Sequence, residues 1–68
     1  MTASHPDVGD RVRLTAPMDD PYPVAVGTEG TIDWVSLGGS MPQIGVKWDD
    51  GRSLMLLPGI DAFEILDG

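Results

Sequence analysis

The fold depends most on residues 43–57, which read QIGVKWDDGRSLMLL. Over the first six of these residues Ile44, Val46 and Trp48 share one face, as in a strand with one buried side. The Asp-Gly pair that follows suits a hairpin turn, because glycine readily adopts the positive φ angles that such turns require. We therefore predict a strand over 43–48, a turn over 49–52 and a second strand over 53–57 that pairs back on the first.

Similar strand patterns occur on both sides of this hairpin. Residues 10–15 alternate apolar and basic side chains, and residues 31–36 are rich in β-branched and aromatic ones. Residues 60–66 supply a short turn and a last edge strand. No stretch carries apolar residues at the spacing of an amphipathic helix. The sequence predicts an all-β fold in which about five short strands curl into a small, partly open barrel.

A long proline-rich loop is predicted between the first two strands. Residues 16–23 contain Pro17, Pro21 and Pro23, and proline lacks the N–H donor that a central strand needs. We expect this loop to lie on the surface.

The composition indicates one small domain. The chain has 68 residues, no cysteine and a formal net charge of -7, and a chain of this length buries a single modest core. We predict a flexible leader over 1–8 and one barrel domain over 9–66. The absence of cysteine favours a cytoplasmic location, and the N-terminus has no features of a signal peptide or membrane anchor. The acidic charge makes nucleic acid a poor partner, because phosphates would be repelled.

Four blocks of sequence carry a resemblance to a known family. They are Gly9-Asp10-Arg11-Val12, residues 27–32, residues 46–54, and Leu57-Pro58-Gly59 with Phe63. In this order they are similar to a family of small SH3-like barrels of unknown function, found in bacteria and their phages. The resemblance implies a five-stranded SH3-like barrel and transfers no catalytic or binding residue. The Ala-Leu-Tyr-Asp-Tyr stretch and paired tryptophans of signalling SH3 domains are missing, so proline-rich ligands are not expected.

The aromatic residues divide into core and surface candidates. Trp48 and Phe63 are expected in the core, and burial is also predicted for Trp34. A β-bulge near Asp33 is the alternative, which would turn Val35 inward and Trp34 outward. For Tyr22 two interpretations stay open: an exposed contact residue, or a lid over the end of the barrel.

The sequence supplies little material for catalysis or metal binding. The single histidine, His5, lies in the predicted leader, and no nucleophile and base stand in a recognisable arrangement. The pairs Asp19-Asp20 and Asp49-Asp50 lack the spacing of a calcium loop. We predict no catalytic residue, no metal site and no cofactor.

Charge provides the functional hypothesis. The loops that carry Asp19-Asp20 and Asp49-Asp50 are expected to form one acidic surface. This surface would steer a basic protein partner, and in the extreme case would imitate DNA. We predict a non-enzymatic interaction module, a phage or bacterial accessory protein, against the simpler interpretation that the acidic surface only keeps the domain soluble. Self-assembly is the second candidate, and nucleic-acid binding through Arg11, Arg13 and Lys47 is the third. The predicted partner-binding residues are Asp19, Asp20, Tyr22, Asp49, Asp50 and Arg52.

Overall fold

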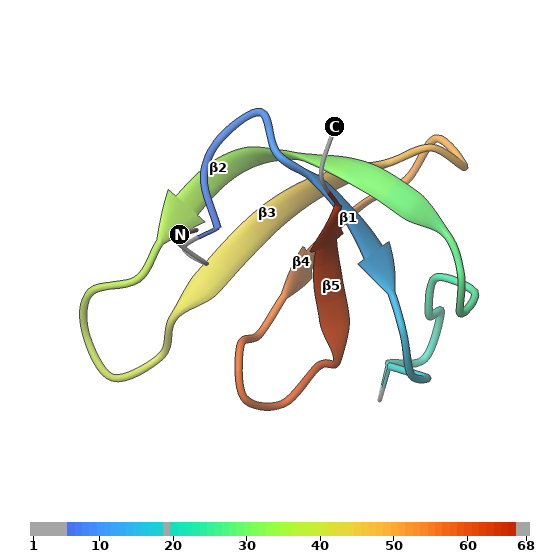
Figure 1. Cartoon of the computed structure of the whole chain (residues 1–68). Coiled ribbons are helices and arrows are strands. Elements are labelled where there is room, and N and C mark those ends of the chain that lie inside the picture. The colour runs from blue at the N-terminus through green and yellow to red at the C-terminus, as the bar shows by residue number, and fades with distance from the viewer. Residues whose placement is uncertain (1–5, 19, 67–68) are drawn as a thin grey trace.

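The computed structural model describes residues 6–18 and 20–66, which form five β-strands and no helix (Figure 1). The all-β prediction is confirmed. The strands are β1 Arg11–Leu14, β2 Glu29–Ser36, β3 Gln43–Trp48, β4 Ser53–Leu56 and β5 Phe63–Leu66.

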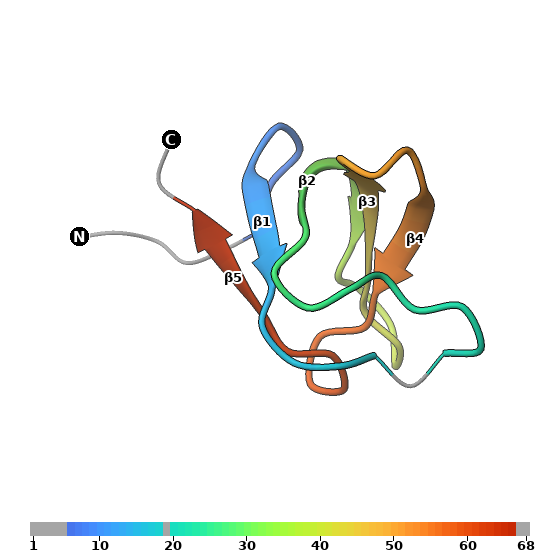
Figure 2. The same cartoon turned by 90° about the vertical axis from the view of Figure 1, so that its right-hand side faces the viewer.

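The strands form one antiparallel sheet in the order β4-β3-β2-β1-β5. The sheet is strongly curved, with β4 and β5 at its two ends (Figure 2). No ladder joins these two edge strands in the described part of the chain. The predicted barrel is therefore present only as a curved open sheet. Each edge strand is four residues long, which leaves few backbone groups for a closing ladder.

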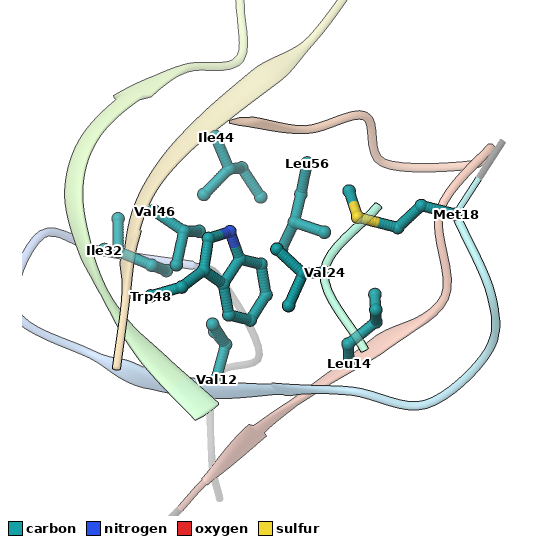
Figure 3. Close-up of a cluster of buried hydrophobic side chains, with 9 residues drawn as sticks. All are labelled: Val12, Leu14, Met18, Val24, Ile32, Ile44, Val46, Trp48 and Leu56. Carbon is teal, nitrogen blue, oxygen red and sulfur yellow. The ribbon is translucent and has the colours of Figure 1, made fainter. Parts of the chain in front are cut away.

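The segment 15–28 closes part of the concave side that the sheet leaves open. Its described residues, 15–18 and 20–28, contain no strand, as its prolines predict, and they pass in front of the sheet in Figure 2. Met18 and Val24 from this segment are nevertheless buried in the core (Figure 3). The prediction of a purely surface loop is wrong at Met18, because this apolar side chain fills space that an unclosed sheet does not cover.

The core surrounds Trp48, which is 2% exposed. Its indole Nε1 donates a hydrogen bond of 2.9 Å to the carbonyl oxygen of Leu54, so its polar atom is satisfied despite burial. Phe63 is half-buried and packs against this core from β5. The predicted inward face of β3 is confirmed. The buried residues are Val12, Leu14, Met18, Val24, Ile32, Ile44, Val46, Trp48 and Leu56.

The predicted turn between β3 and β4 is also confirmed. Gly51 N donates to Trp48 O at 3.0 Å, and Trp48 N donates to Arg52 O at 2.8 Å. Gly51 has a φ of 94°, a left-handed conformation that disfavours residues with a side chain. These features define a three-residue hairpin loop that ends in a glycine bulge.

Trp34 does not occupy the buried position predicted for it. The β2–β3 ladder shifts register between Ile32 and Trp34, so Asp33 is an extra residue on β2. This bulge turns Val35 toward the core and leaves Trp34 41% exposed on the convex face. The alternative of a bulge near Asp33 is the one observed.

The Trp34 indole lies over Gly45, its partner on β3. A Cβ atom added to Gly45 would lie 1.9 Å from Trp34 Nε1. We expect Gly45→Ala to displace the indole and to lower the free energy of unfolding by less than about 1 kcal/mol, because the ring that must move is itself partly exposed. Trp34→Ala alone should cost less than about 1 kcal/mol, because the ring is partly exposed. Urea melts of both single variants and the double variant test this packing, and strictly additive effects would contradict it.

Candidate functional site

Arg52 joins the proline-rich loop to the β3–β4 turn. Its guanidinium donates to the carbonyl oxygen of Pro23 at 3.0 Å and also to that of Tyr22. These bonds connect residues about thirty positions apart in sequence. The two loops that were predicted to share a surface are thus held together by a cation and two backbone acceptors.

Two aspartates order the loops on either side of this contact. Asp20 Oδ1 accepts from Tyr22 N at 3.0 Å, and Asp50 Oδ1 accepts from Arg52 N at 2.9 Å. Both are bonds from a carboxylate to the backbone two residues on, which stabilise turns. Tyr22 is 77% exposed, so it is a surface residue and not a lid. We call the residues linked by these contacts, Asp20, Tyr22, Asp50 and Arg52, the acidic rim.

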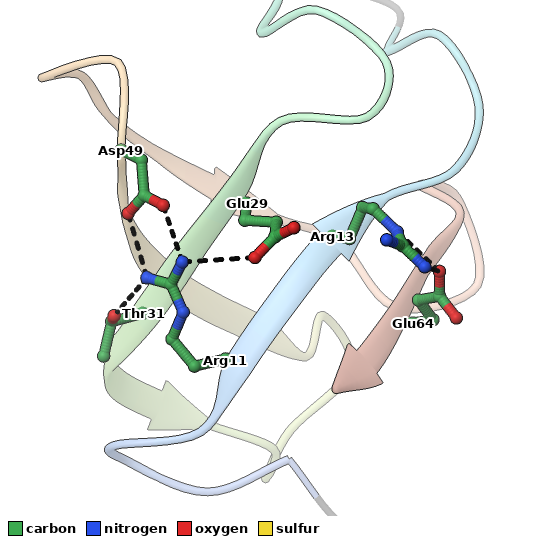
Figure 4. A network of polar contacts seen from close by, with 6 residues as sticks. All are labelled: Arg11, Arg13, Glu29, Thr31, Asp49 and Glu64. Carbon is green, nitrogen blue, oxygen red and sulfur yellow. Dashed lines mark hydrogen bonds and ion pairs between the residues drawn. The ribbon is translucent and has the colours of Figure 1, made fainter. Parts of the chain in front are cut away.

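The carboxylate of Asp49 faces a different cation. Arg11 Nη1 and Nη2 donate to the two Asp49 oxygens at 2.9 and 2.6 Å (Figure 4). The same guanidinium donates to Thr31 Oγ1 at 3.0 Å and to Glu29 Oε1 at 3.3 Å. Asp49 was predicted to bind a partner, but its charge is already matched within the chain. The structure brings Asp20, Tyr22, Asp50 and Arg52 together and leaves Asp49 in this second cluster.

The hydrogen bonds from Arg11 hold the pKa of Asp49 below its ordinary value. An aspartate with a lowered pKa stabilises the folded state above its unfolded pKa of about 3.9, and this contribution is lost as the pH falls through the folded pKa. We expect the wild type to lose its advantage over Asp49→Asn as the pH falls below about 4.

Urea melts between pH 7 and pH 2.5 measure this difference. Arg11→Gln should abolish the same pH-dependent component, and the double variant should lose nothing further. An Asp49→Asn variant whose stability runs parallel to the wild type over this range would contradict the pairing.

The outward arginines are both paired with carboxylates. Arg13 Nε donates to Glu64 Oε2 at 2.7 Å across the β1–β5 ladder (Figure 4). Lys47 is exposed on β3. The surface on which nucleic-acid binding would depend therefore carries two guanidinium groups that are neutralised by neighbouring acids, which weakens attraction to phosphate.

Two hollows flank β4, and neither was predicted from the sequence. The inner groove, about 520 Å³, lies between β4, the 15–28 segment and the loop after β4, where Met18, Leu57 and Ile60 line it. The outer hollow, about 190 Å³, lies on the convex face beside Trp34, Gly45 and Met55. The available signal was Gly45, since a glycine inside a strand often marks a place where another group approaches closely.

Some predicted features lie outside the described residues or have no counterpart within them. Asp19 and His5 fall outside residues 6–18 and 20–66, as does most of the predicted leader. Within those ranges no three metal-binding side chains of the histidine, cysteine, aspartate or glutamate type gather. None of the described segments is a helix long and apolar enough to span a membrane.

One protein-family model, described as "Domain of unknown function (DUF4314)", matches residues 3–66. The chain belongs to this family. No match was found to a curated protein or to a solved structure. The predicted resemblance is confirmed to the extent that a small domain family of unknown function covers most of the chain. The SH3-like and phage parts of the resemblance stay predictions for this DUF4314 domain.

Proposed function

We propose that this domain is a non-enzymatic protein-interaction module whose acidic rim binds a basic partner protein. The observation that carries the proposal is the pair of hydrogen bonds from Arg52 to the backbone of Tyr22 and Pro23. These bonds join the exposed Tyr22 and the turn at Asp20 to the turn at Asp50. A turn that is already held by hydrogen bonds loses less conformational entropy on binding. Tyrosine contributes a large contact area from few rotatable bonds.

The charge distribution also supports a basic partner. The chain carries a net charge of -7, while Arg11 and Arg13 form ion pairs and Arg52 binds backbone carbonyls. The excess negative charge would steer a positively charged protein, and imitation of DNA is the extreme form of this interaction.

We also propose that this domain has an SH3-like architecture and a bacterial or phage origin. The strand order and the curvature of the sheet support an SH3-like barrel architecture. The resemblance noted from sequence supports a bacterial or phage accessory protein that acts in the cytoplasm, the host cytoplasm if the chain is phage-encoded.

The test is capture of partners from a bacterial lysate on immobilised domain, followed by affinity measurements on the purified partner at low and high salt. The double variant Asp20→Asn with Asp50→Asn removes two charges but keeps the Oδ1 acceptors of both turns. We expect it to weaken binding about tenfold at low salt, and less at high salt, because exposed charges are screened within about 10 Å at 0.1 M.

The matched control removes two charges from another turn. Asp7 and Asp10 also accept backbone N–H bonds, and the variant Asp7→Asn with Asp10→Asn should change the affinity less than about threefold. Equal losses in the two double variants would mean that net charge, and not the acidic rim, governs binding. If the affinity for the partner did not change with salt concentration, the electrostatic proposal would be wrong.

Self-assembly is the second candidate, and the open sheet is the observation that favours it. Among residues 6–18 and 20–66, β4 and β5 each pair with one neighbouring strand only, and such edges offer backbone groups to a second chain. Sedimentation over a wide range of protein concentration distinguishes the candidates, since a constant monomer mass would exclude self-assembly.

A further inference from the structure

The β4 edge lacks most of the features by which proteins protect an edge strand. Residues 53–56 contain no charge and no proline, and their ladder with β3 runs without a register shift. The other edge strand, β5, carries Glu64, which is paired with Arg13. Charged residues, prolines and bulges normally discourage the addition of another strand, so β4 is the more receptive of the two edges.

The register determines which backbone groups β4 offers. Trp48 N donates to Arg52 O, which makes this the closing hydrogen-bonded pair of the hairpin. Hydrogen-bonded and non-hydrogen-bonded pairs alternate along an antiparallel ladder. Leu54 and Leu56, opposite Val46 and Ile44, therefore direct their N–H and C=O groups toward β3. Ser53 and Met55 direct theirs to the free edge.

The two hollows lie on opposite sides of this edge. Ser53, Leu54 and Met55 contribute to both the inner groove and the outer hollow. Side chains of a strand alternate between the two faces of a sheet. A strand added beside β4 would direct one set of side chains toward the inner groove, with Met18 and Ile60. The other set would continue the row formed by Trp34, Gly45 and Met55 across β2, β3 and β4.

The charged residues around the two hollows are acidic, which favours a basic strand at this edge. Asp20 and Asp61 line the inner groove, and Asp33 lines the outer hollow. No described residue that lines either hollow is an arginine or a lysine. An incoming strand with basic residues would meet complementary charge, whereas a second copy of this chain would bring the same carboxylates and a net charge of -7.

We propose that the β4 edge binds an extended peptide segment with alternating apolar and basic side chains, which adds as a sixth strand to the sheet. The backbone groups of Ser53 and Met55 supply the main-chain hydrogen bonds, and the two hollows receive successive side chains. The choice of a basic segment rests on the proposed function. The site of attachment rests on the β4 edge alone.

The probe is a labelled octapeptide of alternating valine and lysine with blocked ends, titrated into the 15N-labelled domain at low salt. On binding, hydrogen exchange at the amides of Ser53 and Met55 should slow at least tenfold. The Leu54 amide is the internal control, because it already bonds to β3 and should change little. Alternating valine and glutamate provides the charge control and should bind at least tenfold more weakly.

Two N-methylated forms of the probe test the backbone contact. Methyl groups on all valine amides block one edge of the extended peptide, and methyl groups on all lysine amides block the other. One form should lose binding while the other retains it, because only one edge of the peptide faces β4. If both methylated forms bound as tightly as the unmethylated probe, strand addition would be overturned.

Variants of the domain complete the design. Met55→Lys places a charge on the edge and should lower the affinity for the probe at least tenfold. Ser36→Lys, at the exposed end of β2, should change this affinity less than threefold. Met55→Pro removes the outward N–H and should have the same effect as Met55→Lys. Urea melts establish that each variant is folded. If Met55→Pro does not fold, Met55→Lys alone tests whether the probe binds at the β4 edge.

The remaining outcomes separate this inference from the proposed function. Binding that is weakened by Asp20→Asn with Asp50→Asn but leaves the Ser53 and Met55 amides unprotected would overturn strand addition and keep the proposed function. Binding of a neutral valine and glutamine peptide as tightly as the basic probe would keep strand addition and overturn the basic partner. Protection of both amides on raising the protein concentration without peptide would show that a second copy occupies the edge, which also overturns the proposal.

Discussion

Trp48→Ala is expected to lower the free energy of unfolding by about 3–5 kcal/mol. The side chain is 2% exposed and is surrounded by other buried residues (Figure 3). Its removal leaves a cavity and takes the indole donor away from the Leu54 carbonyl. Small domains have total stabilities near the lower end of about 5–15 kcal/mol, so this variant should retain little stability and should be partly unfolded without denaturant.

The measurement is a urea melt followed by circular dichroism, with Trp34→Ala as the matched control. Both variants lose a tryptophan, but Trp34 is partly exposed and should cost less than about 1 kcal/mol. Trp48→Phe keeps an aromatic ring in the core and should remain folded, which gives a measurable midpoint if the alanine variant has none. Similar losses in Trp48→Ala and Trp34→Ala would contradict the placement of the two indoles.

Ile44→Ala and Val46→Ala should each lower the free energy of unfolding by about 2–4 kcal/mol. Both side chains are buried on β3, and the neighbouring strands restrict how far the structure can relax around a cavity. Lys47→Ala on the exposed face of the same strand should change the stability by less than about 0.5 kcal/mol, and Asp50→Ala should also cost less than the core variants.

Urea midpoints of these variants at constant slope give the comparison. Successive side chains of a strand point to opposite faces. An error of one residue in register would therefore exchange the buried and the exposed residues of β3. A harmless Val46→Ala together with a damaging Lys47→Ala would therefore show that the inward and outward assignments on β3 are reversed.

The β3–β4 hairpin could be predicted because its signals are local. Alternation over 43–48 and the Asp-Gly turn act within a few residues of each other, and the structure confirms both. The same reasoning failed at Trp34. The bulge at Asp33 inserts one residue into β2, and the local pattern is compatible both with the predicted regular strand, which buries Trp34, and with the bulge, which exposes it. Packing of Trp34 over Gly45 and of Val35 against the core distinguishes them.

The candidate site was predictable in composition and less so in arrangement. Asp20, Tyr22, Asp50 and Arg52 were expected to share a surface, and Arg52 links them through contacts across about thirty residues. Asp49 was grouped with them because it belongs to the predicted turn over residues 49–52, which was expected at the same rim as the proline-rich loop. Adjacent residues in a turn can face different partners, and Arg11 on β1 engages Asp49.

The sequence by itself determined the strand-forming class of the chain, the turn at Gly51 and the inward face of β3, because backbone preferences and side-chain alternation operate over short distances along the chain. Only the tertiary structure decided that the sheet stays open, that Met18 enters the core, and that two hollows border the β4 edge. These features depend on which distant segments meet and how their side chains share space.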